Sequence, residues 1–197
     1  MALIGFVDDS VYVERLGSPQ VANLLRVLFH SPDWAEAFIR LAGAQMNVLA
    51  LPARDRELVI LQTGYMLKAP YVVAQHEGIS EVLGITEAQR EALRGWGKPG
   101  NLFGGGKPSA DRCPTDLFDD REAALLRLVT SLVQRTYPND KALEDARAFF
   151  SEAELVEIVG VQGFAATVAG ITLTFQVDVD PIAGDDLLRF ANAVGDA

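Results

Sequence analysis

Reactive sulfur and imidazole are scarce in this chain of 197 residues, which has one cysteine, Cys113, and two histidines, His30 and His76. A single thiol cannot form a disulfide within the chain, so nothing in the cysteine content points to an oxidising compartment. Two distant histidines without a dense cluster of Cys, Asp or Glu give no metal-site signature. We therefore predict a cytoplasmic protein without a disulfide framework or a metal site.

Basic residues are also few, because 17 Lys and Arg face 27 Asp and Glu, for a formal charge of −10. Nucleic acids and anionic membrane surfaces both favour a basic protein face, so we expect neither as a partner. The N-terminus lacks the basic start of a signal peptide, and Asp8 and Asp9 interrupt its apolar run. The expected partners are a small-molecule substrate and other copies of the chain.

Long apolar runs are absent except at residues 158–177, which carry no charge over 20 positions. This length could span a bilayer, but Gln162, Gln176 and three threonines dilute the run, and its flanks are acidic. We predict instead a helix buried in the core or against another subunit. Its three glycines lower helix propensity, so we expect close helix packing to compensate.

Strand signals are scarce too, whereas caps, prolines and apolar periodicity indicate helices along the chain. These features predict an all-α fold of about eight helices in one domain over residues 1–185. A loop at 95–117, rich in glycine and proline, interrupts this domain, and an acidic tail at 186–197 follows it. The helices are expected near 18–29, 31–49, 52–67, 70–83, 86–94, 118–136, 140–150 and 152–175.

The main candidate for chemistry is a carboxylate and an imidazole placed 19 residues apart, Glu57 and His76. The two expected helices that carry them are joined by a short turn, so antiparallel packing would bring the side chains together. A pair of this kind in apolar sequence could transfer protons. The alternative is structural: Glu57 pairs with Arg54 or Arg56, and His76 is a core residue whose polar atoms are satisfied.

Residues 51–84 resemble the carboxymuconolactone decarboxylase family, which also includes alkylhydroperoxidase D. The shared pattern is a leucine-rich helix that begins with an Arg-Glu pair, followed by a turn, a tyrosine, a histidine and, eight residues later, a glycine. In this chain these residues are Arg56-Glu57, Tyr71, His76 and Gly84. Weaker similarity extends to YVERLG at 12–17, HSPDWAEAF at 30–38 and SEAELVEIV at 151–159.

Two departures from the family pattern bear on the reaction. The peroxidase branch has cysteines seven and four residues before the histidine, where this chain has Ala69 and Val72. Peroxide reduction of that kind needs a nucleophilic and a resolving thiol. The decarboxylase branch often has an acidic residue and a tryptophan after the tyrosine, and these positions are Val72 and Val73. The pocket is therefore expected to be more apolar than usual.

The resemblance implies a homotrimer or homohexamer and cofactor-free acid–base chemistry on a small organic acid, lactone or enolisable carbonyl compound, most simply a decarboxylation or isomerisation. His76 would move the proton, and Glu57 would orient His76. Tyr71 and Lys68 are candidates for binding a substrate oxygen. Trp34 and Phe38 could either fill the core or form a wall of the pocket. Two rivals are a peroxidase that uses Cys113 and a binding protein that kept the fold without the chemistry.

Overall fold

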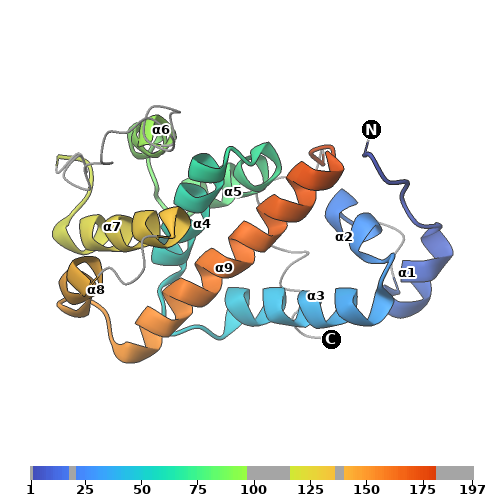
Figure 1. The fold of residues 1–197 in the computed structure, drawn as a ribbon, viewed down its shortest axis with the longest axis horizontal. Coiled ribbons are helices and arrows are strands. Elements are labelled where there is room, and N and C mark those ends of the chain that lie inside the picture. The colour runs from blue at the N-terminus through green and yellow to red at the C-terminus, as the bar shows by residue number, and fades with distance from the viewer. Residues whose placement is uncertain (1, 18–20, 97–115, 136–139, 181–197) are drawn as a thin grey trace.

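The computed structural model describes residues 2–17, 21–96, 116–135 and 140–180, and over these ranges the chain is helical without strands (Figure 1). This confirms the all-α prediction. The helices in the described ranges are α1 (Asp9–Leu16), α2 (Asn23–Leu28), α3 (Pro32–Asn47), α4 (Ala53–Leu67), α5 (Pro70–Val82), α6 (Glu87–Trp96), α7 (Asp120–Gln134), α8 (Asp140–Arg147) and α9 (Glu152–Phe175).

Helix starts follow the capping signals of the sequence. Ser151 accepts a hydrogen bond from the Glu154 backbone, and the Glu154 side chain accepts one from the Ser151 backbone, which forms the expected capping box of α9. Thr86 and Gln89 exchange the same two bonds at α6. At the end of α5, Gly84 has a φ of 78°, a left-handed conformation that glycine adopts without strain.

The N-terminal region differs from the prediction. Instead of one helix at 18–29, α2 covers Asn23–Leu28 only, and Ser18 and Pro19 lie outside the described residues. The helix α1 was not predicted. Its signals were present, however, because the Asp8 side chain accepts from the Ser10 backbone at the start and Gly17 ends the helix in the left-handed region.

Several other predictions fall on residues that the structure does not describe. Most of the 95–117 loop, Cys113 within it and the 186–197 tail lie outside the described ranges. The single domain over 1–185 stays a prediction.

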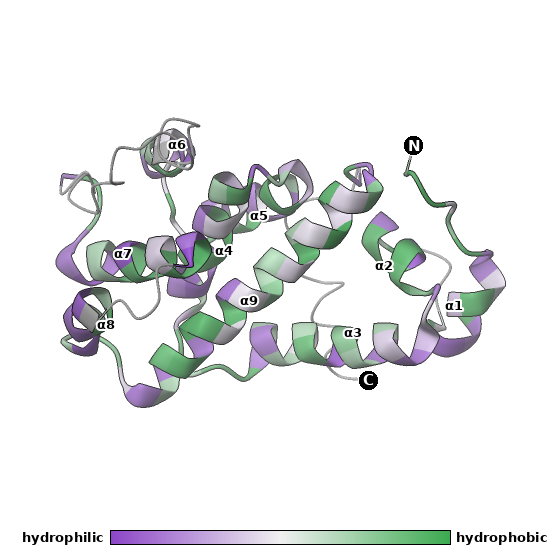
Figure 2. Ribbon diagram, viewed as in Figure 1, coloured by the Kyte–Doolittle hydropathy of each residue, from purple (hydrophilic) through white to green (hydrophobic). Residues whose placement is uncertain are grey.

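The centre of the fold is α4, which packs against α5, α6, α7 and α9 (Figures 1 and 2). A tight turn joins α4 to α5: Lys68 adopts a left-handed conformation, and the Ala69 backbone donates to the Gly64 carbonyl. A Cβ on Gly64 would lie 3.1 Å from Val72 Cγ1 and 3.2 Å from Val73 Cγ2. The absence of a side chain at Gly64 therefore lets α5 approach α4 closely, which brings the Glu57 and His76 regions together.

The long helix α9 crosses the molecule between the α8 end and the α2 end (Figure 1). Its glycines do not mark close packing inside this chain. A Cβ added at Gly160, Gly163 or Gly170 would meet no other heavy atom within 4 Å. The expectation that close helix packing compensates for these glycines is therefore wrong for contacts within one copy of the chain.

Candidate active site

Glu57 and His76 form a direct hydrogen bond across the α4–α5 pair. The Glu57 side chain is fully buried, and its Oε2 lies 2.7 Å from Nδ1 of His76, whose side chain is 20% exposed. Because a carboxylate only accepts, Nδ1 carries the proton and donates it. The lone pair of a neutral His76 is then on Nε2. The expectation that the two side chains meet is confirmed.

Arg56 compensates the buried charge of Glu57. Its Nε lies 3.3 Å from Glu57 Oε1, and its Nη1 donates to the carbonyl oxygens of Gln45 and Met46 at the end of α3. Both Arg56 and Glu57 are almost completely buried. A buried charge needs such partners, so Arg56 holds Glu57 in place on the side opposite His76. Arg54 pairs with Glu122 instead.

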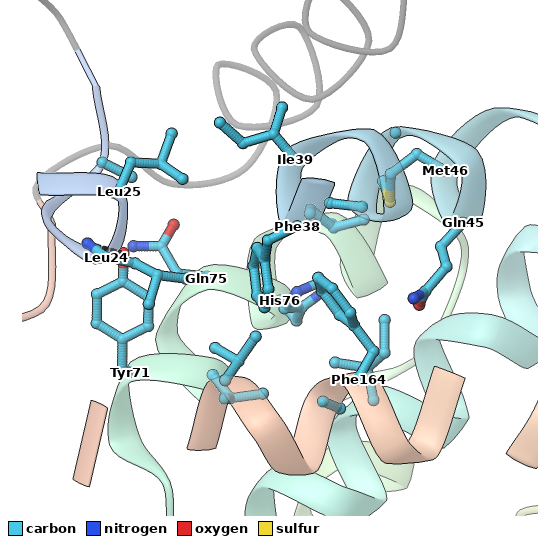
Figure 3. A pocket seen from close by; sticks show the side chains of 18 of the residues that line it. Leu24, Leu25, Phe38, Ile39, Gln45, Met46, Tyr71, Gln75, His76 and Phe164 are labelled. Atoms are coloured by element: carbon cyan, nitrogen blue, oxygen red, sulfur yellow. Dashed lines mark hydrogen bonds between the residues drawn. The ribbon is translucent and has the colours of Figure 1, made fainter. Parts of the chain in front are cut away.

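An apolar cavity of about 180 Å³ opens beside His76 (Figure 3). Aliphatic and aromatic side chains from α2, α3, α5 and α9 form most of its wall, which matches the apolar pocket expected from Val72 and Val73. Of these two valines, Val72 lines the cavity and Val73 does not. The lining residues are Ala22, Leu24, Leu25, Phe38, Ile39, Ala42, Gly43, Gln45, Met46, Arg56, Ile60, Tyr71, Val72, Gln75, His76, Ile79, Phe164, Ala165 and Val168.

Two phenylalanine rings pack together in the wall of this cavity. Phe38 of α3, Phe164 of α9 and His76 all line it (Figure 3). The centroids of the two rings are 4.4 Å apart, a distance typical of packed aromatic pairs. Phe38 is thus both a core residue and a wall of the cavity, so both of the roles considered for it apply.

The cavity also holds an amide without a partner, that of Gln75. The residue is 4% exposed, and neither its Nε2 nor its Oε1 has a hydrogen-bond partner. Leaving a buried amide unpaired costs on the order of 1–3 kcal/mol, so such groups are rare unless they serve a purpose. Gln75 precedes His76 on α5 and reaches toward α2, beside Leu24 (Figure 3).

The hydroxyl of Tyr71 is already engaged within the chain. It donates to Asp180 Oδ2 at 2.5 Å and accepts from the Leu24 backbone at 3.4 Å. Burial raises the pKa of Tyr71 far above its usual value, and the bond to Asp180 adds to this, so the phenol stays protonated. Tyr71 lines the cavity with its ring, while its hydroxyl ties α5 to α2 and to the segment after α9.

The other two predicted substrate contacts lie elsewhere. Lys68 is exposed at the left-handed end of α4 and does not line the cavity, because the helix ends before its side chain can turn inward. Trp34 is 47% exposed and lines a separate hollow between α3 and α9. Neither residue is placed to bind a substrate at His76.

Three residues of the site were not identified from the sequence. Arg56 was considered only as a partner of Glu57, and Phe164 only as part of an apolar run. Gln75 gave one usable signal, its position next to His76, but a glutamine at that position is usually a surface residue. Whether Gln75 belongs to the surface or to the site depends on its burial, and its burial depends on how α2 and α3 cover α5.

Comparison with known proteins supports the fold. The chain matches no family model and no curated protein. Among solved structures, an uncharacterised peroxidase-related protein from Ralstonia eutropha, described as an alkylhydroperoxidase AhpD core, superposes with a TM-score of 0.69 at 15% identity, covering 97% of this chain and 96% of that one.

Two further structures give the same result. An uncharacterised peroxidase-related protein from Silicibacter has a TM-score of 0.66 at 16% identity, covering 87% of this chain and 82% of that one. A protein of unknown function from Agrobacterium tumefaciens, suggested to be the antioxidant defence protein AhpD, has a TM-score of 0.63 at 22% identity, covering 78% and 94%. The chain therefore has the helical fold of alkylhydroperoxidase D-like proteins, as its resemblance to that family implied.

Proposed function

We propose that the protein is a cofactor-free acid–base enzyme that transfers a proton at a carbon next to a carbonyl group of a small, mostly apolar compound. The observation that carries this proposal is the 2.7 Å bond from His76 Nδ1 to buried Glu57 at the edge of an apolar cavity. A histidine held in one tautomer beside a shielded cavity is suited to act as a general acid or base.

The proton transfer uses Nε2 of His76. This atom takes a proton from the carbon next to the carbonyl, and the electron pair of the broken C–H bond moves into an enolate. The imidazolium formed in this step is stabilised by the Glu57 carboxylate at Nδ1. In a β,γ-unsaturated carbonyl compound the enolate is conjugated with the C=C bond, so return of the proton to the γ carbon gives the α,β-unsaturated isomer, and the enzyme regains its starting state.

Decarboxylation would use the same acid. Loss of carbon dioxide from a β-keto acid leaves an enolate, and protonated Nε2 of His76 would deliver a proton to its carbon. Decarboxylation needs a site that binds the carboxylate of the substrate, whereas the isomerisation does not. The basic residues that line the cavity, Arg56 and His76, are both already paired with Glu57. This favours proton transfer on an uncharged carbonyl compound over a carboxylated substrate.

The size of the cavity sets the size of the substrate. An apolar cavity of roughly 150 Å³ holds a benzene-sized molecule. With a volume of about 180 Å³, this cavity would take a single ring with small substituents.

The test is an exchange experiment with cyclic ketones in deuterium oxide. Proton NMR would follow the incorporation of deuterium next to the carbonyl of cyclohexanone and 2-methylcyclohexanone, with and without protein. We expect His76→Ala to lower the exchange rate by ~10²–10⁴-fold, the usual contribution of a positioned general base. Glu57→Gln keeps the shape but removes the charge, and a smaller loss is expected.

The matched control is His30→Ala. His30 is the other histidine, and its Nε2 lies 2.8 Å from the Gly5 carbonyl oxygen, away from the cavity. This variant should keep the wild-type rate. Equal rates for His76→Ala and wild type would refute the proposal, and ketone binding without exchange would favour a binding protein of the same fold.

A peroxidase would need different chemistry. Ala69 and Val72, both buried, stand where the thiols of the peroxidase branch would be, and Cys113 lies outside the described residues. A peroxidase is therefore the second candidate function, after the acid–base enzyme. Peroxide reduction that disappears in Cys113→Ser would reverse the order.

A further inference from the structure

The unpaired amide of Gln75 is a polar group of the cavity that the proposed proton transfer does not use. It is buried in the wall between α2 and α5, with an amide donor and an amide acceptor both unpaired. Its neighbours in the lining, such as Leu24, Leu25 and Ile79, cannot form hydrogen bonds through their side chains. A molecule in the cavity could satisfy both of its atoms.

Gln75 and His76 are adjacent on α5, and both line the cavity (Figure 3). Consecutive helical residues point about 100° apart, so the two side chains enter the cavity from different directions. A ring-sized molecule between them could meet the amide with one edge and Nε2 of His76 with another. The pair would then fix both the position and the orientation of a substrate.

We propose that Gln75 is the specificity-determining residue of this site and selects uncharged ligands that carry a hydrogen-bond donor next to a carbonyl oxygen. Compounds of this class are hydroxyketones, enols of dicarbonyl compounds and cyclic amides. The ligand oxygen accepts from Nε2 of Gln75, and the ligand O–H or N–H donates to Oε1. This inference rests on the proposed function for the identity of the site, but it concerns binding and not the proton transfer.

The donor–acceptor pattern disfavours two other ligand classes. A carboxylate has no donor, so Oε1 of Gln75 would stay unpaired and would face a negative charge. A simple ketone has no donor either and would pair with Nε2 alone. A ligand with both groups pairs with the whole amide.

The probes are δ-valerolactam and cyclohexanone, two six-membered rings that differ in the N–H group. Binding to the full-length protein would be followed by chemical-shift titration of ¹⁵N-labelled samples. In Gln75→Leu we expect the lactam affinity to fall about tenfold or more, because each hydrogen bond is worth roughly fivefold. The cyclohexanone affinity should fall by less than the lactam affinity, since the ketone loses one bond at most.

The control is Gln62→Leu, which replaces another fully buried glutamine. Gln62 donates to Thr130 and does not line the cavity, so this variant should keep the lactam preference of the wild type. An unchanged preference in Gln75→Leu, in a sample whose spectrum shows that it is folded, would overturn the inference. Selective loss of the preference in Gln75→Leu alone would support it.

His76→Ala separates the two proposals. If Gln75 recognises the ligand, the ratio of lactam to ketone affinity should persist in His76→Ala, whatever happens to exchange. If exchange survives in His76→Ala while the ratio is lost in Gln75→Leu, the proposed function fails and the recognition role stands. A ratio that is lost in His76→Ala but kept in Gln75→Leu would refute the role of Gln75.

Discussion

Helices α4 and α9 both carry apolar residues on all sides, yet the chain buries them very differently. Twelve of the 15 residues of α4 are buried, including charged Asp55, Arg56 and Glu57. Only seven of the 24 residues of α9 are buried. A helix that is hydrophobic all round is expected to be covered on all sides. The fold meets this expectation for α4 and leaves α9 partly uncovered.

The uncovered face of α9 forms a groove with α3. By length and composition α9 could cross a membrane, and 33% of its most apolar window is buried. The groove has no charged residue in its lining, which consists of Trp34, Ala37, Phe38, Leu41, Gly160, Gly163, Phe164 and Thr167. We propose that a second copy of the chain covers this α3–α9 groove, since open glycines allow close approach of another helix.

This difference also concerns the site. Phe38 and Phe164 line the cavity beside His76 on one side and the α3–α9 groove on the other. The same two rings therefore separate the candidate active site from the proposed subunit contact. Association of two copies would place the contact against the wall of the cavity. The charged residues of the site, in contrast, come from α4 within one copy.

The largest expected effect compares one leucine of α4 with one valine of α9. Leu61 is fully buried, and Leu61→Ala should lower the free energy of unfolding by about 2–5 kcal/mol, because the cavity left behind adds to the lost burial. Val159 is 50% exposed, and Val159→Ala should change it by less than ~0.5 kcal/mol. Urea unfolding at low protein concentration measures both values. Similar losses for the two variants would mean that α9 is covered within a single copy.

The sequence predicted α4 and α9 about equally well as helices, because prolines, caps and apolar periodicity are local signals. It also predicted the contact of Glu57 with His76, since a short turn leaves few ways to pack two adjacent helices. It could not predict burial. Lys68, expected to bind a substrate oxygen, is exposed, and the α9 glycines, expected to mark close packing, face open space. These outcomes depend on distant elements, or on another copy.

The second-largest expected effect tests whether a second copy of the chain covers the α3–α9 groove. Gly163→Glu places a charge in the α3–α9 groove, where an added Cβ meets nothing within 4 Å. We expect the variant to stay folded and to dissociate, since burying two unpaired carboxylates at a subunit contact is unfavourable. Sedimentation velocity at micromolar concentration gives the mass of both proteins. Gly5→Glu, also in open space but outside the groove, should keep the wild-type mass. A wild-type protein that is already monomeric would contradict the proposal.

The smallest expected effect is the change in stability on a Gly→Ala substitution, which should be opposite in sign in α4 and α9. Gly64→Ala puts a Cβ at 3.1 Å from Val72 Cγ1, and a buried β-branched side chain has little freedom to move away. We expect a loss of about 1 kcal/mol, at the low end of the cost of overpacking. Gly170→Ala adds a methyl group in open space, so better helix propensity should stabilise the monomer by roughly 0.5–1 kcal/mol. Thermal unfolding of dilute samples should therefore move the two midpoints in opposite directions. Destabilisation by Gly170→Ala that grows with protein concentration would place this glycine inside the subunit contact, and destabilisation at every concentration would show that α9 packs closely within its own chain.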